Sequence, residues 1–192
     1  MAKYSRFKTK IHPLTYVIGL ILVALVAVVI IFSVPSEKQK IYNEYYQKQI
    51  RTEQMTQEQL IDKDHVYKNI TVSQLESKID SKELVVVYIG GNWCPVCLKE
   101  VGIYSSEFKK NEELLAAAKN IFYLKKHQDK DIKGLEQLAE KLEFDNPKSY
   151  PTLLSFYDGK LIDVKYTAGA EDAKTIKTNV LLYFDQVLQA TK

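Results

Sequence analysis

Two cysteines follow an apolar run and are separated by two residues. The run, residues 84–89, ends at Gly90 and Gly91, and the cysteines are Cys94 and Cys97. The apolar residues are successive rather than alternating, so both faces of this segment are expected to be buried, as in the central strand of a mixed sheet. A Cys-x-x-Cys pair at the point where a strand gives way to a helix predicts thiol–disulfide chemistry.

Pro95 indicates which cysteine reacts first. Proline suits the first position of a helix, because its fixed φ fits and its missing N–H would be unpaired there. Cys94 is then expected at or just before the helix start, where free N–H groups and the helix dipole lower a thiol pKa from about 8.5. We therefore expect Cys94 to be the nucleophile and Cys97, which is one turn further along and more buried, to be the resolving cysteine.

Two other uses of a cysteine pair fit the sequence less well. A zinc site needs about four nitrogen or sulfur ligands, whereas the chain has 2 Cys and 3 His without ligand spacing. A purely structural disulfide is disfavoured because stabilisation by loop closure grows with loop length, and this loop is very short. Redox chemistry without a metal ion is the favoured interpretation.

The segments on either side of the cysteines predict an α/β fold. Short apolar runs at 70–72 and 121–124 indicate strands that precede and follow 84–89. Ser73 and Glu76 have the spacing of a capping box that opens a helix after the first strand. Helices alternate with these strands, and the resulting β-α-β-α-β-α order requires parallel pairing.

The last part of the chain predicts antiparallel pairing. Two apolar segments, 151–157 and 161–166, flank Asp158 and Gly159, a dipeptide that is typical of a hairpin turn. The chain then ends in a helix with one apolar face, made of Ile176, Val180, Tyr183, Phe184, Val187 and Leu188. A mixed sheet closed by a hairpin and a final helix is expected.

Two segments resemble, in order, the signature segments of the thioredoxin family. They are Trp93-Cys94-Pro95-Val96-Cys97 and Tyr150-Pro151-Thr152-Leu153-Leu154-Ser155-Phe156. The resemblance covers about residues 66–192 and implies a thioredoxin-like mixed sheet flanked by helices. It also implies that Pro151 is a cis-proline beside the cysteines and that the neighbouring backbone pairs with the substrate. The candidate substrate-binding or structural residues are thus Trp93, Pro95, Val96, Tyr150, Pro151 and Thr152.

Two features depart from the pattern of thioredoxins proper. Thioredoxins have a buried aspartate in the strand before the cysteines, which accepts the proton of the resolving thiol, and Tyr88 stands at that position. This argues against proton transfer of the thioredoxin type. The dipeptide Pro95-Val96 resembles the form found in glutaredoxins and exported oxidases, and Val96 adds no positive charge. An intermediate reduction potential is expected.

The N-terminal part is organised around one uncharged apolar segment, residues 14–34, which is long enough to cross a hydrocarbon core. A cleaved signal peptide has a shorter apolar region of about 7–15 residues and a small-residue cleavage site. We expect an uncleaved transmembrane anchor after a short basic cytoplasmic tail, residues 1–13, with cleavage after Ser36 as the alternative. Residues 35–65 are polar and predict a stalk that is partly helical.

Basic residues flank the apolar segment on both sides, so the positive-inside comparison is close to a tie. A short basic tail, one span and a long trailing domain nevertheless favour export of the domain. An oxidising compartment also suits a redox pair. The expected localisation is the cell membrane of a bacterium, with a single-pass chain and an extracytoplasmic C-terminal domain.

The expected function is thiol–disulfide exchange on exported proteins, with the Cys94–Cys97 disulfide as the redox group and no further cofactor. Turnover needs a membrane redox partner. Nucleic acid is not expected as a partner, because the charges are nearly balanced, with 27 Lys and Arg against 24 Asp and Glu. Two alternatives stay open. One is a cytoplasm-facing reductase of the thioredoxin type. The other is an accessory or binding module, because Tyr88-Ile89-Gly90-Gly91 before the cysteines also resembles thioredoxin-like accessory proteins of bacteriocin production.

Overall fold

The computed structural model describes residues 13–52, 55–125, 129–145 and 149–192, which fall into two compact units. The first unit, Met1–Ser36, contains helix α1 (Pro13–Ser33). Within α1, Pro13–Ile30 is long and apolar enough to cross a membrane by length and composition. The expected basic tail, except for Pro13, lies outside the described residues.

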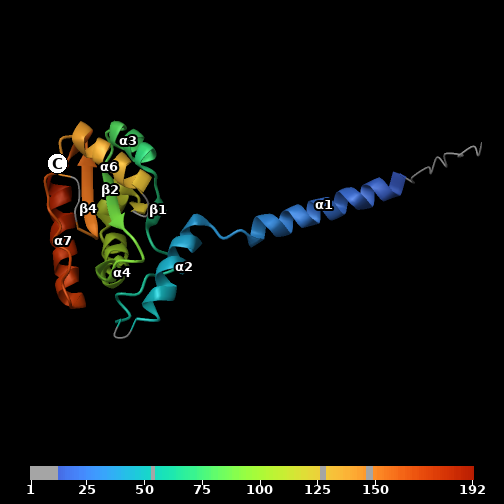
Figure 1. Cartoon of the computed structure of the whole chain (residues 1–192), viewed down its shortest axis with the longest axis horizontal. Coiled ribbons are helices and arrows are strands. Elements are labelled where there is room, and N and C mark those ends of the chain that lie inside the picture. Colours follow the sequence, from blue (N-terminus) through green and yellow to red (C-terminus); the bar gives the residue numbers. More distant parts are fainter. Residues whose placement is uncertain (1–12, 53–54, 126–128, 146–148) are drawn as a thin grey trace, which may run out of the picture. The chain divides into compact units, whose positions relative to one another are not determined.

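The second unit, Glu37–Lys192, is built around a five-stranded mixed sheet with the strand order β1-β3-β2-β4-β5 (Figure 1). β1 (Tyr67–Asn69) and β2 (Val85–Gly90) pair parallel to β3 (Ile121–Lys125). β4 (Thr152–Tyr157) pairs antiparallel to β2, and β5 (Lys160–Leu161) pairs antiparallel to β4. The expected mixed sheet, with a parallel part closed by an antiparallel hairpin, is confirmed.

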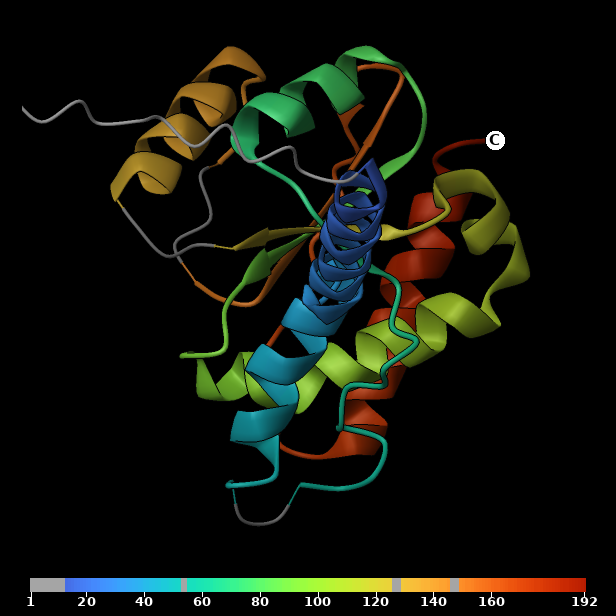
Figure 2. The ribbon, with the colours of Figure 1, turned by 90° about the vertical axis from the view of Figure 1, so that its right-hand side faces the viewer.

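Helices cover both faces of this sheet (Figure 2). α3 (Val72–Asp80) and α6 (Asp129–Lys141) lie over one face, and α4 (Pro95–Lys110) and α7 (Ala173–Gln189) lie over the other. The short helix α5 (Glu112–Ala118) follows α4. All six expected apolar positions of α7 are buried, which confirms the predicted face of the final helix.

β2 is buried on both faces, as its unbroken apolar sequence predicts. Val85, Val87 and Ile89 belong to the core on the side of α3 and α6, while Val86 and Tyr88 belong to the core on the side of α4 and α7. Each of these side chains is at most 2% exposed. The strand that leads to the cysteines is therefore fixed from both sides of the sheet.

The first strand and the helix after it begin earlier than expected. β1 ends at Asn69, and Thr71 is the N-cap of α3. The Thr71 hydroxyl accepts the N–H of Gln74, and the Gln74 side chain accepts the N–H of Thr71. Both Thr71 with Gln74 and Ser73 with Glu76 have capping-box spacing, and the early end of β1 places the cap at Thr71. The expected Ser73 cap is wrong.

The hairpin turn forms at the expected dipeptide, but its second strand is short. Asp158 and Gly159 have φ of 50° and 79°, which both lie in the left-handed region that two-residue hairpin turns use. β5 has only two residues and ends at Leu161. The expected strand over 161–166 is therefore wrong beyond Leu161, and the chain runs from there to α7 without regular structure.

Residues 37–65 belong to the folded unit, which corrects the expected stalk and the expected domain start at residue 66. Helix α2 (Glu37–Gln49) buries Ile41 and Tyr45 in the core on the side of α4 and α7. These side chains recur at helical spacing, so α2 presents an apolar stripe that is removed from water by packing on the domain.

Gln49, the last residue of α2, links this helix to the rest of the domain by hydrogen bonds. Its side chain is 0% exposed. Its amide nitrogen donates to the carbonyl oxygens of Gln59 (2.8 Å) and Leu98 (2.7 Å), and its amide oxygen accepts the N–H of Ile61 (2.9 Å). One side chain thus satisfies three backbone groups, including a carbonyl in the first turns of α4.

We expect Gln49→Leu to lower the free energy of unfolding by about 2–3 kcal/mol, because backbone groups in a buried site lose their partner. The measurement is urea unfolding of the full chain in detergent, followed by fluorescence of the single tryptophan, Trp93. Gln47→Leu, at an exposed position of the same helix, is the matched control and should change stability little. Equal effects of the two substitutions would contradict the role of Gln49.

Candidate redox site

Two loops meet at the carboxyl end of β2. The cysteine loop leaves this strand at Gly90, while β4 begins at Thr152, whose partner across the sheet is Ile89. Because β2 and β4 are antiparallel, the start of β4 lies where β2 ends. Pro151, which directly precedes Thr152, is therefore held beside the cysteine loop by sheet register.

Cys94 and Cys97 are joined by a disulfide at the first turn of α4. Cys94 is the N-cap and Pro95 is the first helical residue, as predicted. The N–H of Cys97 points at the Sγ of Cys94 (3.1 Å), so the helix start offers a hydrogen bond to that sulfur. Cys94 is 4% exposed and Cys97 is 0% exposed, so Cys94 is the more accessible sulfur of the pair.

The second loop contains the expected cis-proline. The Tyr150–Pro151 peptide bond is cis, and the carbonyl oxygen of Tyr150 lies 3.4 Å from the Sγ of Cys94. The Thr152 hydroxyl donates to the carbonyl of Ser149 (2.7 Å) and closes a short loop around the proline. The structure thus brings the cysteines and this loop together, as the sequence resemblance implies.

Trp93, Pro95 and Val96 are the sequence neighbours of the two cysteines and are more exposed than either of them. Trp93 is 46% exposed, and its ring meets the ring of Tyr150 edge-on at 5.8 Å. Pro95 is exposed and Val96 is half-buried. Gly91 allows this arrangement, since a Cβ there would stand 2.3 Å from the indole nitrogen of Trp93. The residues directly before and after Cys94 are therefore apolar and exposed.

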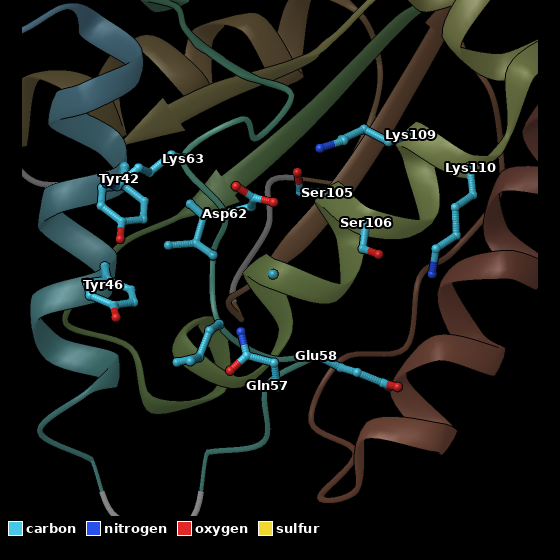
Figure 3. A pocket seen from close by; sticks show the side chains of 13 residues that line it. Tyr42, Tyr46, Gln57, Glu58, Asp62, Lys63, Ser105, Ser106, Lys109 and Lys110 are labelled. Carbon is cyan, nitrogen blue, oxygen red and sulfur yellow. The ribbon is translucent and has the colours of Figure 1, made fainter.

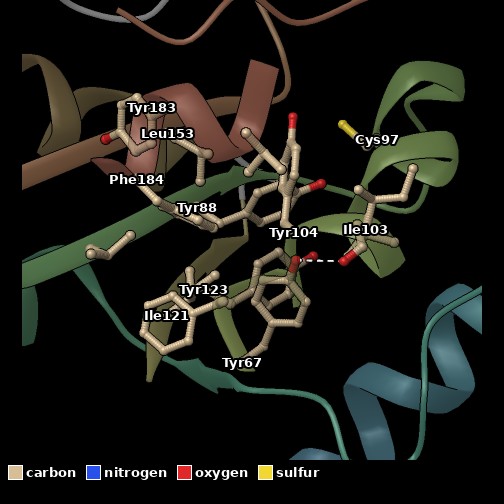
Figure 4. Packing of buried hydrophobic residues seen from close by; sticks show 14 of the residues in the cluster. Tyr67, Tyr88, Cys97, Ile103, Tyr104, Ile121, Tyr123, Leu153, Tyr183 and Phe184 are labelled. Carbon is tan, nitrogen blue, oxygen red and sulfur yellow. Dashed lines mark hydrogen bonds between the residues drawn. The ribbon is translucent and has the colours of Figure 1, made fainter. Parts of the chain in front are cut away.

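Several buried phenols belong to the same core as the cysteines, and Tyr88 is fully buried in β2. Figure 4 shows Tyr67, Tyr88, Tyr104 and Tyr123 in this core. The Tyr88 hydroxyl lies 3.3 Å from that of Tyr45. The sequence shows the tyrosine at position 88 but not the cluster, because the members of the cluster come from different elements. The apolar spacing of α2 was the available signal for Tyr45.

Glu100 is a second buried polar group near the cysteines that sequence analysis did not identify. It follows Cys97 by three residues on α4, is 0% exposed, and accepts hydrogen bonds from the hydroxyls of Tyr104 and Tyr166 and from the N–H of Gly169. Burial raises the pKa of this carboxyl, and the three donors oppose the rise. Glu100 fixes the segment before α7 against α4.

A groove of about 700 Å³ lies elsewhere on the second unit, between α2, the loop after it and α4 (Figure 3). The stacked rings of Tyr42 and Tyr46 form one wall, and Ser105, Lys109 and Lys110 of α4 form the other. The groove lining includes neither cysteine and no residue of the cis-proline loop, so the groove is not the redox site. Within the described residues, His, Cys, Asp and Glu form no group that could hold a metal ion.

The chain has likenesses of low sequence identity among solved structures. No protein-family model and no curated protein matches the chain. The solved structures that it resembles include a thioredoxin of Plasmodium falciparum, with 20% identity, a TM-score of 0.41, and coverage of 60% of this chain and 98% of that one. Thioredoxin O2 of Arabidopsis thaliana, in the oxidised state, has 16% identity and a TM-score of 0.41, with coverage of 62% of this chain and 96% of that one. Mitochondrial thioredoxin 3 of Saccharomyces cerevisiae has 15% identity and a TM-score of 0.39, with coverage of 60% of this chain and 93% of that one. The expected mixed sheet flanked by helices is confirmed by the strand order and pairing of the second unit, and the chemistry of the site rests on its own geometry.

We expect the stability difference between the wild-type chain and Glu100→Gln to depend on pH. A carboxyl with a raised pKa in the folded state stabilises the fold fully below its unfolded pKa, and this contribution is lost as pH rises through the folded pKa. Relative to the neutral glutamine variant, the wild type should therefore lose stability from about pH 4.5 upward.

The measurement is urea unfolding of both full-length chains over a series of pH values. Glu83→Gln, at an exposed position, is the control, and its difference from the wild type should stay nearly constant. A constant difference for Glu100→Gln would contradict the raised pKa.

Proposed function

We propose that the chain catalyses thiol–disulfide exchange with protein substrates through Cys94 and Cys97. The observation that carries this proposal is the position of the disulfide at the start of α4, with the Cys97 N–H aimed at the Sγ of Cys94. A thiolate formed at Cys94 is stabilised there by that N–H and by the helix dipole. A low-pKa sulfur is both a reactive nucleophile and a good leaving group.

As an oxidase, the protein exchanges its disulfide for a client disulfide. A client thiolate attacks the Sγ of Cys94, the Cys94–Cys97 bond breaks, and Cys97 leaves with the electron pair as a thiolate. The second client thiolate attacks the client sulfur of the mixed disulfide and releases Cys94 as a thiolate. The client is oxidised by two electrons, and the protein is left as a dithiol after it takes up two protons.

As a reductase or isomerase, the same steps run in reverse. The Cys94 thiolate attacks a client disulfide and forms the mixed disulfide, and a client thiolate leaves. Cys97 then loses its proton and attacks Cys94, which restores the Cys94–Cys97 disulfide and releases the second client thiolate. Attack at Cys94 in both directions agrees with its greater exposure.

We place the client chain between the cysteines and the cis-proline loop. The Tyr150 carbonyl already lies beside the Sγ of Cys94, and the loop backbone offers pairing to an extended client segment. Trp93 provides apolar contact area, and Pro95 and Val96 border the approach to Cys94. Thr152 holds the loop in place through its bond to Ser149.

Membrane anchoring by α1 is the second part of the proposal. The 21 residues of this helix span about 30 Å at 1.5 Å per residue, which matches a hydrocarbon core. We place the second unit outside the cytoplasm, where disulfides persist, with exported proteins as clients. A membrane protein that reoxidises or rereduces the pair completes the cycle.

We expect Cys97→Ala to accumulate clients on Cys94 as mixed disulfides, because the resolving thiol is absent. The variant chain is expressed in its host, free thiols are blocked by acid and alkylation, and adducts are separated on non-reducing gels and identified by mass spectrometry. Cys94→Ala is the matched control and should trap nothing.

Capture of no client by Cys97→Ala, while Cys94 in that variant reacts with an alkylating reagent, would contradict the exchange reaction. Together with intact biological function in a chain that lacks both cysteines, this result would favour the accessory or binding module.

We expect Cys94 in intact cells to react with a membrane-impermeant thiol reagent after mild reduction, because the second unit faces away from the cytoplasm. The measurement is the mass added to the purified chain, and the double Cys→Ala variant sets the background. Labelling only after cell lysis would place the domain in the cytoplasm and contradict the topology.

A further inference from the structure

The cysteine loop has a neighbour on each side at the carboxyl end of β2. In the strand order β3-β2-β4, β4 lies on one side of β2 and β3 on the other. The cis-proline loop precedes β4, so it borders the cysteine loop on the first side. On the second side β3 ends at Lys125, which is paired in register with Gly90, where the cysteine loop begins. A group held at the end of β3 can therefore reach the cysteine loop.

Helix α2 contacts the cysteine loop on this second side through Glu44. The carboxylate of Glu44 pairs with the ammonium group of Lys125 at 2.7 Å, which joins the helix to the end of β3. The main-chain carbonyl of Glu44 accepts a hydrogen bond from the side-chain amide of Asn92 at 3.2 Å. Asn92 lies two residues before Cys94. One residue of α2 thus contacts both the end of β3 and the cysteine loop.

The same helix also contacts the chain just after the cysteines. The side-chain amide of Gln49 donates to the carbonyl of Leu98 at 2.7 Å, and Leu98 directly follows Cys97. Asn92 and Leu98 are the residues on either side of the segment 93–97, which contains both cysteines. Helix α2 is therefore bonded to the chain immediately before and immediately after the redox segment.

Helix α2 is fixed to the fold by contacts that do not involve the cysteine loop. Ile41 and Tyr45 are 2% and 0% exposed in the core on the side of α4 and α7. The ring of Tyr45 meets the ring of Tyr123 in β3 edge-on at 6.0 Å. Because these side chains hold the helix in place, its bonds to the cysteine segment restrict that segment rather than the helix.

Asn92 is a central residue of the turn that ends at Cys94. The N–H of Cys94 donates to the carbonyl of Gly91 at 3.1 Å. This bond closes a four-residue turn in which Asn92 and Trp93 are the two central residues. Since a turn of four residues moves as a unit, the bond from Asn92 to Glu44 limits the positions that Cys94 can take.

The reactivity of Cys94 depends on the position that this turn gives it. Cys94 is the N-cap of α4, with φ of −92° and ψ of 118°, and the N–H of Cys97 lies 3.1 Å from its Sγ. A cap residue needs this extended backbone to receive such a bond. The effect of the helix dipole also falls off within the first turn. A shift of Cys94 away from the cap would therefore reduce the stabilisation of its thiolate.

The bond from Asn92 lies too near the surface to contribute much to global stability. Asn92 is half-buried, and the side chains of Glu44 and Lys125 are about one-third exposed. When a hydrogen bond at such a position is removed, water can bond the groups that remain. The consequence of the bond is then local, in the position of the turn before Cys94.

We propose that Asn92 is a positioning residue for the exchange reaction and acts by tying the turn before Cys94 to helix α2. The proposal rests on the proposed exchange function and names a residue that serves its first step, the attack by Cys94. It gives α2, the helix that follows the apolar segment, a part in the redox site. Because Glu44 contributes its main-chain carbonyl, the effect depends on the docked position of the helix.

The test measures the reaction of Cys94 as a function of pH. The reduced full-length chain in detergent is mixed with a chromogenic aromatic disulfide, and the first release of coloured thiolate reports attack by Cys94. The rate follows the fraction of thiolate, so its pH midpoint reports how well the thiolate is stabilised. For Asn92→Ala we expect the midpoint to rise by about half a pH unit, or about threefold in thiolate fraction. Urea unfolding of this variant should stay close to that of the wild type.

Asn120→Ala is the matched control. Asn120 is also half-buried, and its side-chain amide also donates to a main-chain carbonyl, that of Ala118 at 3.5 Å. It directly precedes β3, at the end of the parallel strands opposite to the cysteine loop. This variant should leave the pH midpoint of the Cys94 reaction unchanged.

A double variant tests whether Asn92 acts through α2. Gln49→Leu removes the other bond between α2 and the cysteine segment and so loosens the docking of the helix. If Asn92 acts through the docked helix, the two substitutions are coupled. Asn92→Ala should then raise the midpoint in the Gln49→Leu background by less than half of its effect in the wild-type chain.

An unchanged midpoint in Asn92→Ala, an equal rise in Asn120→Ala, or a fully additive rise in the double variant would each overturn the positioning role. A wild-type chain that releases no coloured thiolate would instead contradict the exchange function itself. The two failures are thus distinguishable in one assay.

Discussion

The antiparallel pairing of β2 with β4 is the constraint on which the site depends. The cysteine loop and the cis-proline loop are 56 residues apart at Cys94 and Tyr150, and no local interaction brings them together. The register that pairs Ile89 with Thr152 does so, because each loop is the direct continuation of one paired strand. Burial of β2 on both faces holds this register, since a slip by one residue would exchange its two sets of side chains between the two cores.

The chemistry of the site could be predicted from sequence because its signals are local. A few adjacent residues are enough to predict the start of α4, where Pro95 follows Cys94. The same holds for the hairpin turn at Asp158 and Gly159. The packing of α2 could not be predicted in the same way. Its polar sequence indicated a stalk, and only the folded domain supplies the backbone groups that Gln49 binds. The choice between two capping boxes likewise depended on where β1 ends, which pairing with β3 decides.

The buried phenols show how the same tertiary context changes the meaning of a single residue. In the sequence, Tyr88 is only a bulky residue in a predicted strand. In the fold, its ring is fully buried in the core on the side of α4 and α7. Its hydroxyl lies 3.3 Å from one hydroxyl of α2, that of Tyr45. Helix α2, which lies in the segment predicted to be a stalk, therefore packs in the same core as the two cysteines.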